Sequence, residues 1–523
     1  MSLTQSWPSA PGPRILMLVA NDLTIDTRVR KAASSVARAG FSVIAIGIDA
    51  LGAAPAHEDL DGALLIRVVP DQSPKLSPRP VRLSRPELAD AFRYRAAVRK
   101  ARLHNSRRSL SADVAWAAAS PPRWTGAVGR FASSTARLLL LPPELGGKIE
   151  RRATLLLRRL DRAIRFGPRK STTLLSQLLH QGSILGYRIM GRPSRPILRR
   201  PSWRRDLPEL HRFEVAIGST LDELAPDLIH VHDVFLLGVA TRAKARAERA
   251  GRHVSVVYDA HEYVPGLPID SRRRDAYTDL ENEYVRRVDA IITVSEGLAT
   301  LLHERFGTRP AVVMNAPDME KTIEVEPVRK VAGVPKGSPL IIYVGGIAPH
   351  RGADVLIEAM GYLDSDVHLV FVSNSTTGYV ADLVARGEIL GLGDRLHVVP
   401  YVAPEAVVGY IRSADVSVVP LSREFMNYEI ALPNKLFQSI QAGVPVVVSD
   451  NPEMERFVTR HHVGEVFTSG DVVALAKAVN TILESPERYA HALGDPELLE
   501  LISWRRQAEI VIETYRQLGV EVR

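Results

Sequence analysis

The chain of 523 residues contains no cysteine, and this absence excludes several kinds of site. Disulfide scaffolds, thiolate zinc sites, iron–sulfur clusters and cysteine nucleophiles all need the missing residue. No uninterrupted run of 18 apolar residues occurs, so we expect no transmembrane helix. The first residues, MSLTQSWPSAPGPR, have no apolar segment of the kind that a secretory signal carries, and we therefore expect a cytoplasmic protein.

Several catalytic motifs are missing as well. Neither GxGxxG nor GxxxxGK followed by Ser or Thr occurs, which removes the main support for a dinucleotide oxidoreductase or a P-loop NTPase. HExxH and GxSxG are also absent. His, Asp and Glu show no metal-ligand spacing, and the two DxD strings, Asp59/Asp61 and Asp364/Asp366, read as polar turns. We expect no metal and no bound cofactor.

Positive charge is concentrated in one block. Residues 75–205 contain 30 Lys and Arg against 6 Asp and Glu, although the whole chain has a net charge of only +8. The sequence RRATLLLRRLDRAIRF, within the helical stretch 148–166, places leucines on one face and arginines on the other. This pattern is typical of a segment on an anionic membrane surface. The alternative is a solvated basic helical subdomain. Nucleic-acid binding is not expected, because the block has few aromatic residues and none of the common motifs.

Outside this basic block, short apolar runs of strand length alternate with helical patterns. Examples are Arg14–Ala20 before the helical stretch DTRVRKAASSVARAG, and residues 340–344 before ADVLIEAMGYL. Such alternation predicts parallel, doubly wound α/β sheets. We predict a first domain over 1–325 with 75–205 as a mainly helical insert, a second domain over 326–500, and a helix over 501–523 that crosses back to the first domain. Two facing sheets of this kind place a ligand in the cleft between them.

Two loops at strand ends of the first domain carry more polar residues than packing requires. One holds Asn21 and Asp22, followed by Asp26 and Arg28 at a helix start, where backbone N–H groups favour an anion or a hydroxyl. Asp26 also suits a helix cap. The other loop, Tyr258–Glu262, places His261 between the carboxylates of Asp259 and Glu262, at the end where ligands bind. The strand end His230–Asp233 is a weaker case of the same kind.

Two loops of the second domain favour phosphate. Gly345 and Gly346 allow close backbone approach, and the guanidinium of Arg351 matches the geometry of a phosphate. In the stretch EIALPNKLFQ, Pro433 suits the first turn of a helix, and the N-terminus of that helix directs positive charge at a bound anion together with Lys435. The candidate donor-site residues are therefore Gly345, Gly346, Arg351, Glu429, Asn434, Lys435 and Gln438.

Together these stretches resemble one known family. PDLIHVHD, YDAHEYV, ADVSVVPL, PNKLFQSIQAGVPVVVSDNPEM and NDLTIDTRVRKAA are similar to segments of the family-4 glycosyltransferases of the GT-B fold. The resemblance implies a retaining, metal-independent enzyme that moves a sugar from a nucleotide-sugar to an acceptor, which would be a glycan, a lipid-linked molecule or a small molecule. It also implies that the second domain holds the donor, that His261 lies near the transferred sugar, and that Asn21, Asp22, Asp26, Arg28 and Glu262 face the acceptor.

The chain departs from the family pattern at two places. Gln438 stands where many members have the second of two glutamates, and Glu429 is one residue out of register with the first. Gly346 stands where many members have an arginine. Two other functions therefore stay open. One is an inactive GT-B scaffold that binds a nucleotide-sugar, and the other is a non-hydrolysing NDP-sugar epimerase, which also has two α/β domains.

Overall fold

A computed structural model of the chain describes residues 7–8, 12–49, 57–70, 202–319, 323–373 and 378–522. Most of the predicted basic insert, together with its predicted helices at 89–103 and 148–166, lies outside the described residues. The described residues of 1–77 and 212–523 belong to one compact unit, which contains two parallel sheets. Within the described part of the chain, no helix has both the length and the apolar character needed to cross a membrane.

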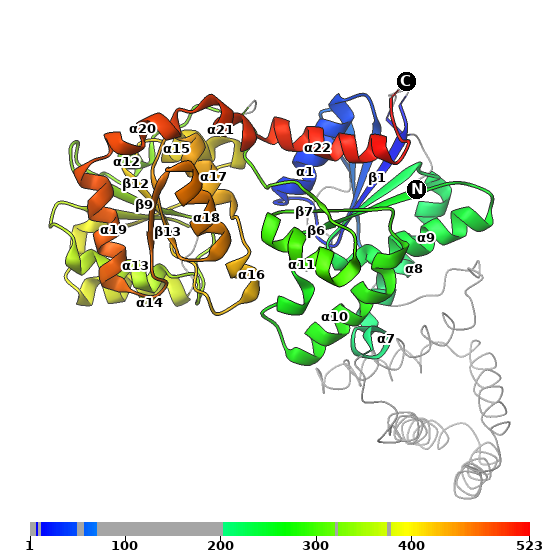
Figure 1. Cartoon of the computed structure of the whole chain (residues 1–523), viewed down its shortest axis with the longest axis horizontal. Helices are drawn as coiled ribbons and strands as arrows, with labels where there is room; N and C mark the ends of the chain where they lie inside the picture. The colour runs from blue at the N-terminus through cyan, green and yellow to red at the C-terminus, as the bar shows by residue number, and fades with distance from the viewer. Residues whose placement is uncertain are drawn as a thin grey trace, which may run out of the picture. The chain divides into compact units, whose positions relative to one another are not determined.

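The first sheet has eight strands in the order β3-β4-β2-β1-β5-β6-β7-β8 (Figure 1). All neighbours are parallel except β3 and β4, which form an antiparallel hairpin at one edge. The central strands are buried on both faces, which explains why they read as continuous apolar runs. The strands are β1 (Arg14–Val19), β2 (Ser42–Ile48), β3 (His57–Leu60), β4 (Ala63–Val68), β5 (Leu228–His232), β6 (Ser255–Ala260), β7 (Ala290–Thr293) and β8 (Ala311–Val312).

Helices connect these strands, and two of their starts can be traced to single residues. The Asp26 side chain accepts a hydrogen bond from the Val29 N–H, which confirms the predicted cap of α1. Asp270 likewise caps the helix that begins at Ser271, because its side chain accepts from the N–H groups of Arg272 and Arg273. The helices are α1 (Thr27–Arg38), α8 (His211–Leu224), α9 (Leu237–Arg249), α10 (Ser271–Tyr284), α11 (Glu296–Phe306) and α22 (Trp504–Gln517), with short 3₁₀ turns η4 (Val234–Leu236), η5 (Val264–Gly266) and η6 (Val285–Arg287). The other unit contributes α7 (Trp203–Asp206) and η3 (Pro208–Leu210).

The second sheet has six parallel strands in the order β11-β10-β9-β12-β13-β14. This is the doubly wound order, in which the direction of winding reverses between β9 and β12. The predicted strands at 340–344 and 368–372 are confirmed without a shift. The strands are β9 (Leu340–Val344), β10 (His368–Val372), β11 (Leu396–Val399), β12 (Val416–Val419), β13 (Val446–Ser449) and β14 (Gly464–Phe467).

The helices of the second sheet begin soon after the predicted domain boundary at 325. The first of them starts at Val328, which is fully buried in the core of the second domain. The helices are α12 (Val328–Val331), α13 (Ala353–Ala359), α14 (Gly378–Ile389), α15 (Val407–Ile411), α16 (Met426–Glu429), α17 (Asn434–Gln441), α18 (Pro452–His461), α19 (Val472–Glu484), α20 (Glu487–Leu493) and α21 (Pro496–Leu501), with 3₁₀ turns η8 (Met360–Tyr362), η9 (Gly393–Arg395) and η10 (Pro404–Ala406).

The last helix, α22, packs on the first sheet's domain, beside α1 (Figure 1). The indole N–H of Trp504 donates to the Ser35 hydroxyl at 3.0 Å, and the Gln507 side-chain oxygen accepts from the Met314 N–H at 2.7 Å. Trp504 and Tyr515 are buried in the same apolar cluster as Ile15 and Val29. The apolar core of the first domain therefore contains residues of β1, α1 and α22, which are far apart in the sequence.

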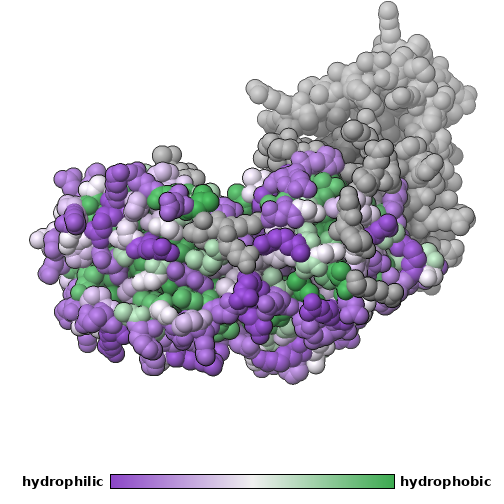
Figure 2. All heavy atoms as spheres, turned by 90° about the horizontal axis from the view of Figure 1, so that it is seen from above, coloured by the Kyte–Doolittle hydropathy of each residue, from purple (hydrophilic) through white to green (hydrophobic). Residues whose placement is uncertain are grey.

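Hydrophilic residues cover much of the described surface on the face drawn in Figure 2.

Candidate functional site

Three strands of the first sheet end beside one another. β1 pairs in parallel with β5, and β5 with β6, so the residues that follow them lie at one edge. The winding of this sheet reverses between β1 and β5, which is where ligands bind in open α/β sheets. Asn21, Asp233 and His261 all follow these strands. The fold therefore brings two of the predicted site loops together.

The loop after β1 is held by its own side chains. The Asn21 amide donates to Asp26 at 2.7 Å, and the Asp22 carboxylate accepts from the Thr24 N–H at 2.9 Å. Burial would raise the pKa of Asp26, but the bonds from Asn21 and Val29 outweigh it and the pKa is lowered. Asn21 is exposed and Asp22 half-buried, so both remain available to a ligand at this edge.

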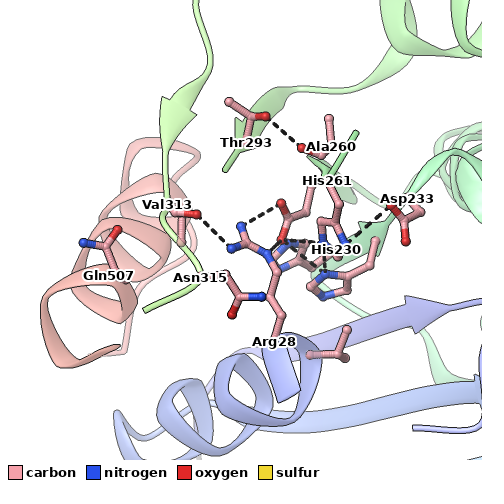
Figure 3. Close-up of polar contacts among 12 residues, drawn as sticks. Arg28, His230, Asp233, Ala260, His261, Thr293, Val313, Asn315 and Gln507 are labelled. Carbon is pink, nitrogen blue, oxygen red and sulfur yellow. Dashed lines mark hydrogen bonds and ion pairs between the residues drawn. The ribbon is translucent and has the colours of Figure 1, made fainter. Parts of the chain in front are cut away.

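The side chain of Arg28 does not lie where the predicted contact with the acceptor would place it. Its side chain is buried, and Nε and Nη2 donate to the two oxygens of Asp259 at 2.8 and 2.9 Å (Figure 3). Nη1 donates to the Val313 carbonyl at 2.8 Å. The guanidinium is thus fully engaged inside the domain. The prediction that Arg28 contacts the acceptor is wrong, because an internal carboxylate 231 residues away holds this side chain.

Asp259 is the centre of a buried group of histidines, which we call the histidine cluster: His230, His232, Asp259 and His261 (Figure 3). The nearest carboxylate oxygen lies 3.2 Å from His232 Nδ1, 3.3 Å from His261 Nε2 and 3.7 Å from His230 Nε2. Burial would raise the pKa of Asp259, but Arg28 and the histidines hold it well below its ordinary value. Asp259 is therefore an ionised carboxylate with N–H groups on several sides.

His261 is the member of the histidine cluster that reaches solvent, with 19% of its side chain exposed. Its Nδ1 lies 3.4 Å from Asp233, and its Nε2 faces Asp259. Burial alone would lower the pKa of His261, but these two carboxylates outweigh it and raise the pKa to about 9. At neutral pH His261 is accordingly a cation. Glu262, the next residue, is exposed beside it.

Asp233 belongs to the strand end that the sequence indicates only weakly as a site, and its backbone conformation is unusual. Its φ of 59° and ψ of 169° lie in a region that residues other than glycine rarely adopt. Such conformations cost on the order of 1–3 kcal/mol and gather at functional sites. The strained turn presents the Asp233 carboxylate to His261. No local sequence signal distinguishes this aspartate from an ordinary turn residue.

The loop after β9 in the second sheet brings two cations together. Gly345 has φ 107°, and a Cβ there would lie 3.8 Å from Lys435 Nζ. A Cβ on Gly346 would lie 3.6 Å from a guanidinium nitrogen of Arg351. The glycines thus leave the backbone open beside Lys435 and Arg351, as the phosphate-binding prediction requires. We call Gly345, Gly346, Arg351 and Lys435 the anion site.

The surroundings of Lys435 are the strongest evidence that an anion binds at this site. It is buried, and within the described part of the chain its Nζ has no hydrogen-bond partner. Nζ lies 3.8 Å above the ring of Tyr343, and burial together with Arg351 lowers the pKa of Lys435 to about 7. Two neighbouring cations, one of them buried and unsatisfied, are unfavourable until a negative ligand binds between them.

The other predicted donor-site residues surround α17. The helix begins at Asn434, so Pro433 is its N-cap residue and does not lie in the first turn as predicted; Gly443 follows the helix at φ 75°. No side chain caps its N-terminus, so the first N–H groups are directed at a ligand position. Gln438 is half-buried on the second turn. Glu429, at the end of α16, accepts from Arg423 at 3.3 Å and is half-buried.

The histidine cluster contains residues of the kinds that bind metal ions, although the sequence predicts no metal. His230, His232 and Asp259 are close enough to one another to hold an ion. Both oxygens of Asp259, however, accept hydrogen bonds from Arg28, whose charge opposes a cation. The donor set therefore suits a hydrogen-bonded network better than a metal, and metal independence stays a prediction.

Comparison with known proteins identifies two matched segments. Residues 149–321 match the family described as Glycosyltransferase Family 4, and residues 324–494 match Glycosyl transferases group 1. The first match begins inside the predicted basic insert, so the similarity extends further than the motifs indicated. The two matched segments meet near residue 322, close to the predicted boundary at 325.

Three known proteins illustrate the similarity. A D-inositol 3-phosphate glycosyltransferase of Xylanimonas cellulosilytica is 27% identical over 36% of this chain and 45% of that protein. The alpha-maltose-1-phosphate synthase of Mycobacterium tuberculosis is 25% identical over 59% of this chain and 87% of that protein. The chain spans about half the length of the first curated relatives it matches. The structure of a sucrose-phosphate synthase from Thermosynechococcus elongatus superposes with a TM-score of 0.60, at 16% identity, over 97% of this chain and 99% of that one. This likeness shows the fold.

Proposed function

Because the chain belongs to family 4 of the glycosyltransferases and has the GT-B fold, we propose that it transfers a sugar from a nucleotide-sugar to an acceptor. The observation that carries the proposal is the anion site, where buried Lys435 has no partner beside Arg351. A diphosphate there would satisfy both cations. The relatives named above are transferases or synthases of sugar compounds, and this agrees with the same chemistry.

The reaction would exchange one bond of the sugar for another. The anomeric carbon loses its bond to the phosphate oxygen and gains a bond to the oxygen of an acceptor hydroxyl, whose proton passes to the departing nucleoside diphosphate. Negative charge develops on that diphosphate as its bond to the sugar breaks. Arg351, Lys435 and the N-terminus of α17 are fixed positive groups that would stabilise this charge. Retention of anomeric configuration and independence from metal are further parts of the proposal.

Arg351→Ala and Lys435→Ala should each weaken binding of the nucleotide-sugar. Losing a charge-assisted contact costs about 1.5–3 kcal/mol, which corresponds to roughly a 10- to 150-fold higher Kd. Binding would be measured by calorimetry, after a thermal-shift screen of UDP-, GDP- and dTDP-sugars has identified the donor. Arg395→Ala, at the far end of the second sheet's β11, serves as the control and should leave Kd unchanged. Wild-type binding in both site variants would refute the donor site.

Analysis of the products formed from the donor that the screen identifies separates the alternatives. An inactive scaffold would bind the donor but release no nucleoside diphosphate in the presence of acceptors. An epimerase would interconvert UDP-sugars without an acceptor. Gln438 and the pairing of Glu429 with Arg423 are the features that an inactive scaffold would explain. An active transferase should instead release one nucleoside diphosphate for each sugar transferred.

The acceptor is proposed to be presented at an anionic membrane surface, bound through the basic block at 75–205. This part of the proposal rests on the sequence alone. The chain should sediment with anionic vesicles but not with neutral ones, and salt should release it, since each Lys or Arg contributes only about 1 kcal/mol near such a surface. Changing Arg151, Arg152, Arg158 and Arg159 to Glu should abolish vesicle binding without unfolding the chain. Equal sedimentation with both vesicle types would refute this.

A further inference from the structure

The histidine cluster contains more polar side chains than are needed to hold one histidine in place. Asp259 is buried at the end of β6, where it already accepts two bonds from Arg28. Nitrogens of His232 and His261 lie within 3.3 Å of the same carboxylate, and His230 Nε2 lies at 3.7 Å. A carboxylate accepts about four hydrogen bonds. Four nitrogens, from Arg28, His230, His232 and His261, therefore converge on one oxygen of Asp259, and the other oxygen accepts from Arg28.

The last helix fixes the proton of one of these histidines. His230 Nδ1 lies 2.6 Å from the Tyr515 hydroxyl, and both side chains are buried. Burial lowers the pKa of His230 and raises that of Tyr515 well above its ordinary value, so both groups are neutral. If Tyr515 donates to Nδ1, the single N–H of His230 is on Nε2, which lies 3.7 Å from Asp259, beyond hydrogen-bond distance. The opposite arrangement would direct a lone pair at the carboxylate, which repels it.

His261 has a carboxylate at each ring nitrogen. Asp233 lies at Nδ1 and Asp259 at Nε2. A neutral imidazole has one N–H and one lone pair, so one carboxylate would face a lone pair. The doubly protonated ring instead presents an N–H to each carboxylate, and its Nε2 also lies 3.4 Å from His232 Nδ1, which can accept as part of a neutral ring. The geometry therefore favours the imidazolium, and it leaves neither nitrogen free to accept a proton from a substrate.

From these contacts we infer that Asp259 is a positioning residue that holds His261 as an imidazolium with a fixed ring, and that Tyr515 supports it by setting the tautomer of His230. In the reaction proposed above, on which this role rests, His261 then acts as a fixed cation beside the transferred sugar and not as a general base. Tyr515 links the last helix to this site without touching the substrate.

Other charged groups around His261 do not overturn this arrangement. His232 is neutral, because burial lowers its pKa to about 3. Arg28 opposes a second cation, but its charge is matched by Asp259. The titratable and charged groups that face His261 come from the loop before α1, from α1, and from the ends of β5 and β6: Asp26, Arg28, His230, His232, Asp233, Asp259 and Glu262.

The test follows the ring nitrogens of ¹⁵N-histidine by NMR as pH is raised, in the full chain without substrate. In wild type, one histidine should titrate near pH 9, and its signals should be missing in His261→Gln. In Asp259→Asn, which keeps the shape of the side chain, the same histidine should titrate at least one pH unit lower. Circular dichroism checks that the variant is folded.

A second variant keeps the test decisive if Asp259→Asn does not fold. Tyr515→Phe removes only the hydroxyl and keeps the ring against Phe41. It should change the tautomer signals of His230 and lower the titration pH of His261, by less than Asp259→Asn does. Tyr489→Phe removes a buried hydroxyl that bonds Glu465 in the second domain, and it should change neither.

Three outcomes would overturn the inference: titration of His261 near its ordinary value of 6.5 in wild type, no change in a folded Asp259→Asn variant, or no change in Tyr515→Phe. Donor binding is measured separately by calorimetry. A chain that shows the titration but binds no nucleotide-sugar would refute the proposed function and leave the role of Asp259 in holding the imidazolium standing. The reverse result would refute only the positioning role.

Discussion

Arg28→Met should lower the free energy of unfolding by about 3–5 kcal/mol, because removing one partner of a buried ion pair leaves the other charge uncompensated. The side chains of Arg28 and Asp259 are only 4% and 2% exposed, so water cannot replace the lost contact. Methionine fills much of the space, which limits the cavity contribution. Urea unfolding followed by circular dichroism would measure the change.

Arg30→Met is the matched control for that prediction. Arg30 lies on the same helix and pairs with Glu58 at 2.6 Å, but the two side chains are 25% and 30% exposed. A pair this accessible contributes about 0.2–1 kcal/mol. Equal losses of unfolding free energy in the two variants would show that the burial of the Arg28–Asp259 pair does not increase its contribution to stability. The double variant Arg28→Met with Asp259→Leu should recover part of the loss, since it removes both charges.

His261→Ala should reduce turnover by about 10²- to 10³-fold while the Kd for the donor changes only slightly. This size is typical for removing one preorganised electrostatic group from a reacting centre. The residue is half-buried among carboxylates at one edge of its sheet, whereas the anion site, which is proposed to hold the donor diphosphate, belongs to the other sheet. Steady-state kinetics and calorimetry on the same preparation would separate turnover from affinity.

His303→Ala, at an exposed position on α11, is the control for loss of a histidine as such. It should leave both turnover and Kd at wild-type values. If His261→Ala instead raises the Kd as much as it lowers turnover, the histidine contributes to donor binding. Unchanged turnover in that variant would leave His261 with a structural role only.

Local patterns in the sequence predicted the strands well. Apolar runs such as 340–344 identified buried strands, and polar residues immediately after such runs identified one edge of the sheet, where ligand binding stays a prediction. The cap at Asp26 and the helix that starts after Pro433 also depend on neighbouring residues alone. These features could be predicted because strand burial and capping are decided within a few residues.

What escaped prediction depends on residues far apart in the chain. The partner of Arg28 is 231 residues away, and Tyr515 is 285 residues from His230. The burial of Lys435 follows from packing of α17 against the second sheet, and no spacing in the sequence reveals it. The hairpin β3–β4 is different, since Asp61-Gly62 is a recognisable turn signal: both residues have positive φ, as a two-residue hairpin turn requires. Its strand residue Asp59 had been interpreted as part of a polar turn, which was wrong.

The place of α22 has a consequence for how the chain matures during synthesis. Ser35 and Trp504 are 469 residues apart, yet both belong to the packing of the first domain. At roughly 5–20 residues per second, a ribosome adds Trp504 on the order of tens of seconds after it has added Ser35. Throughout that interval the side of α1 that later meets α22, which includes Ser35 and Lys31, lacks this partner. We therefore expect the packing of the first domain to be completed only after residues 504–517 have been made.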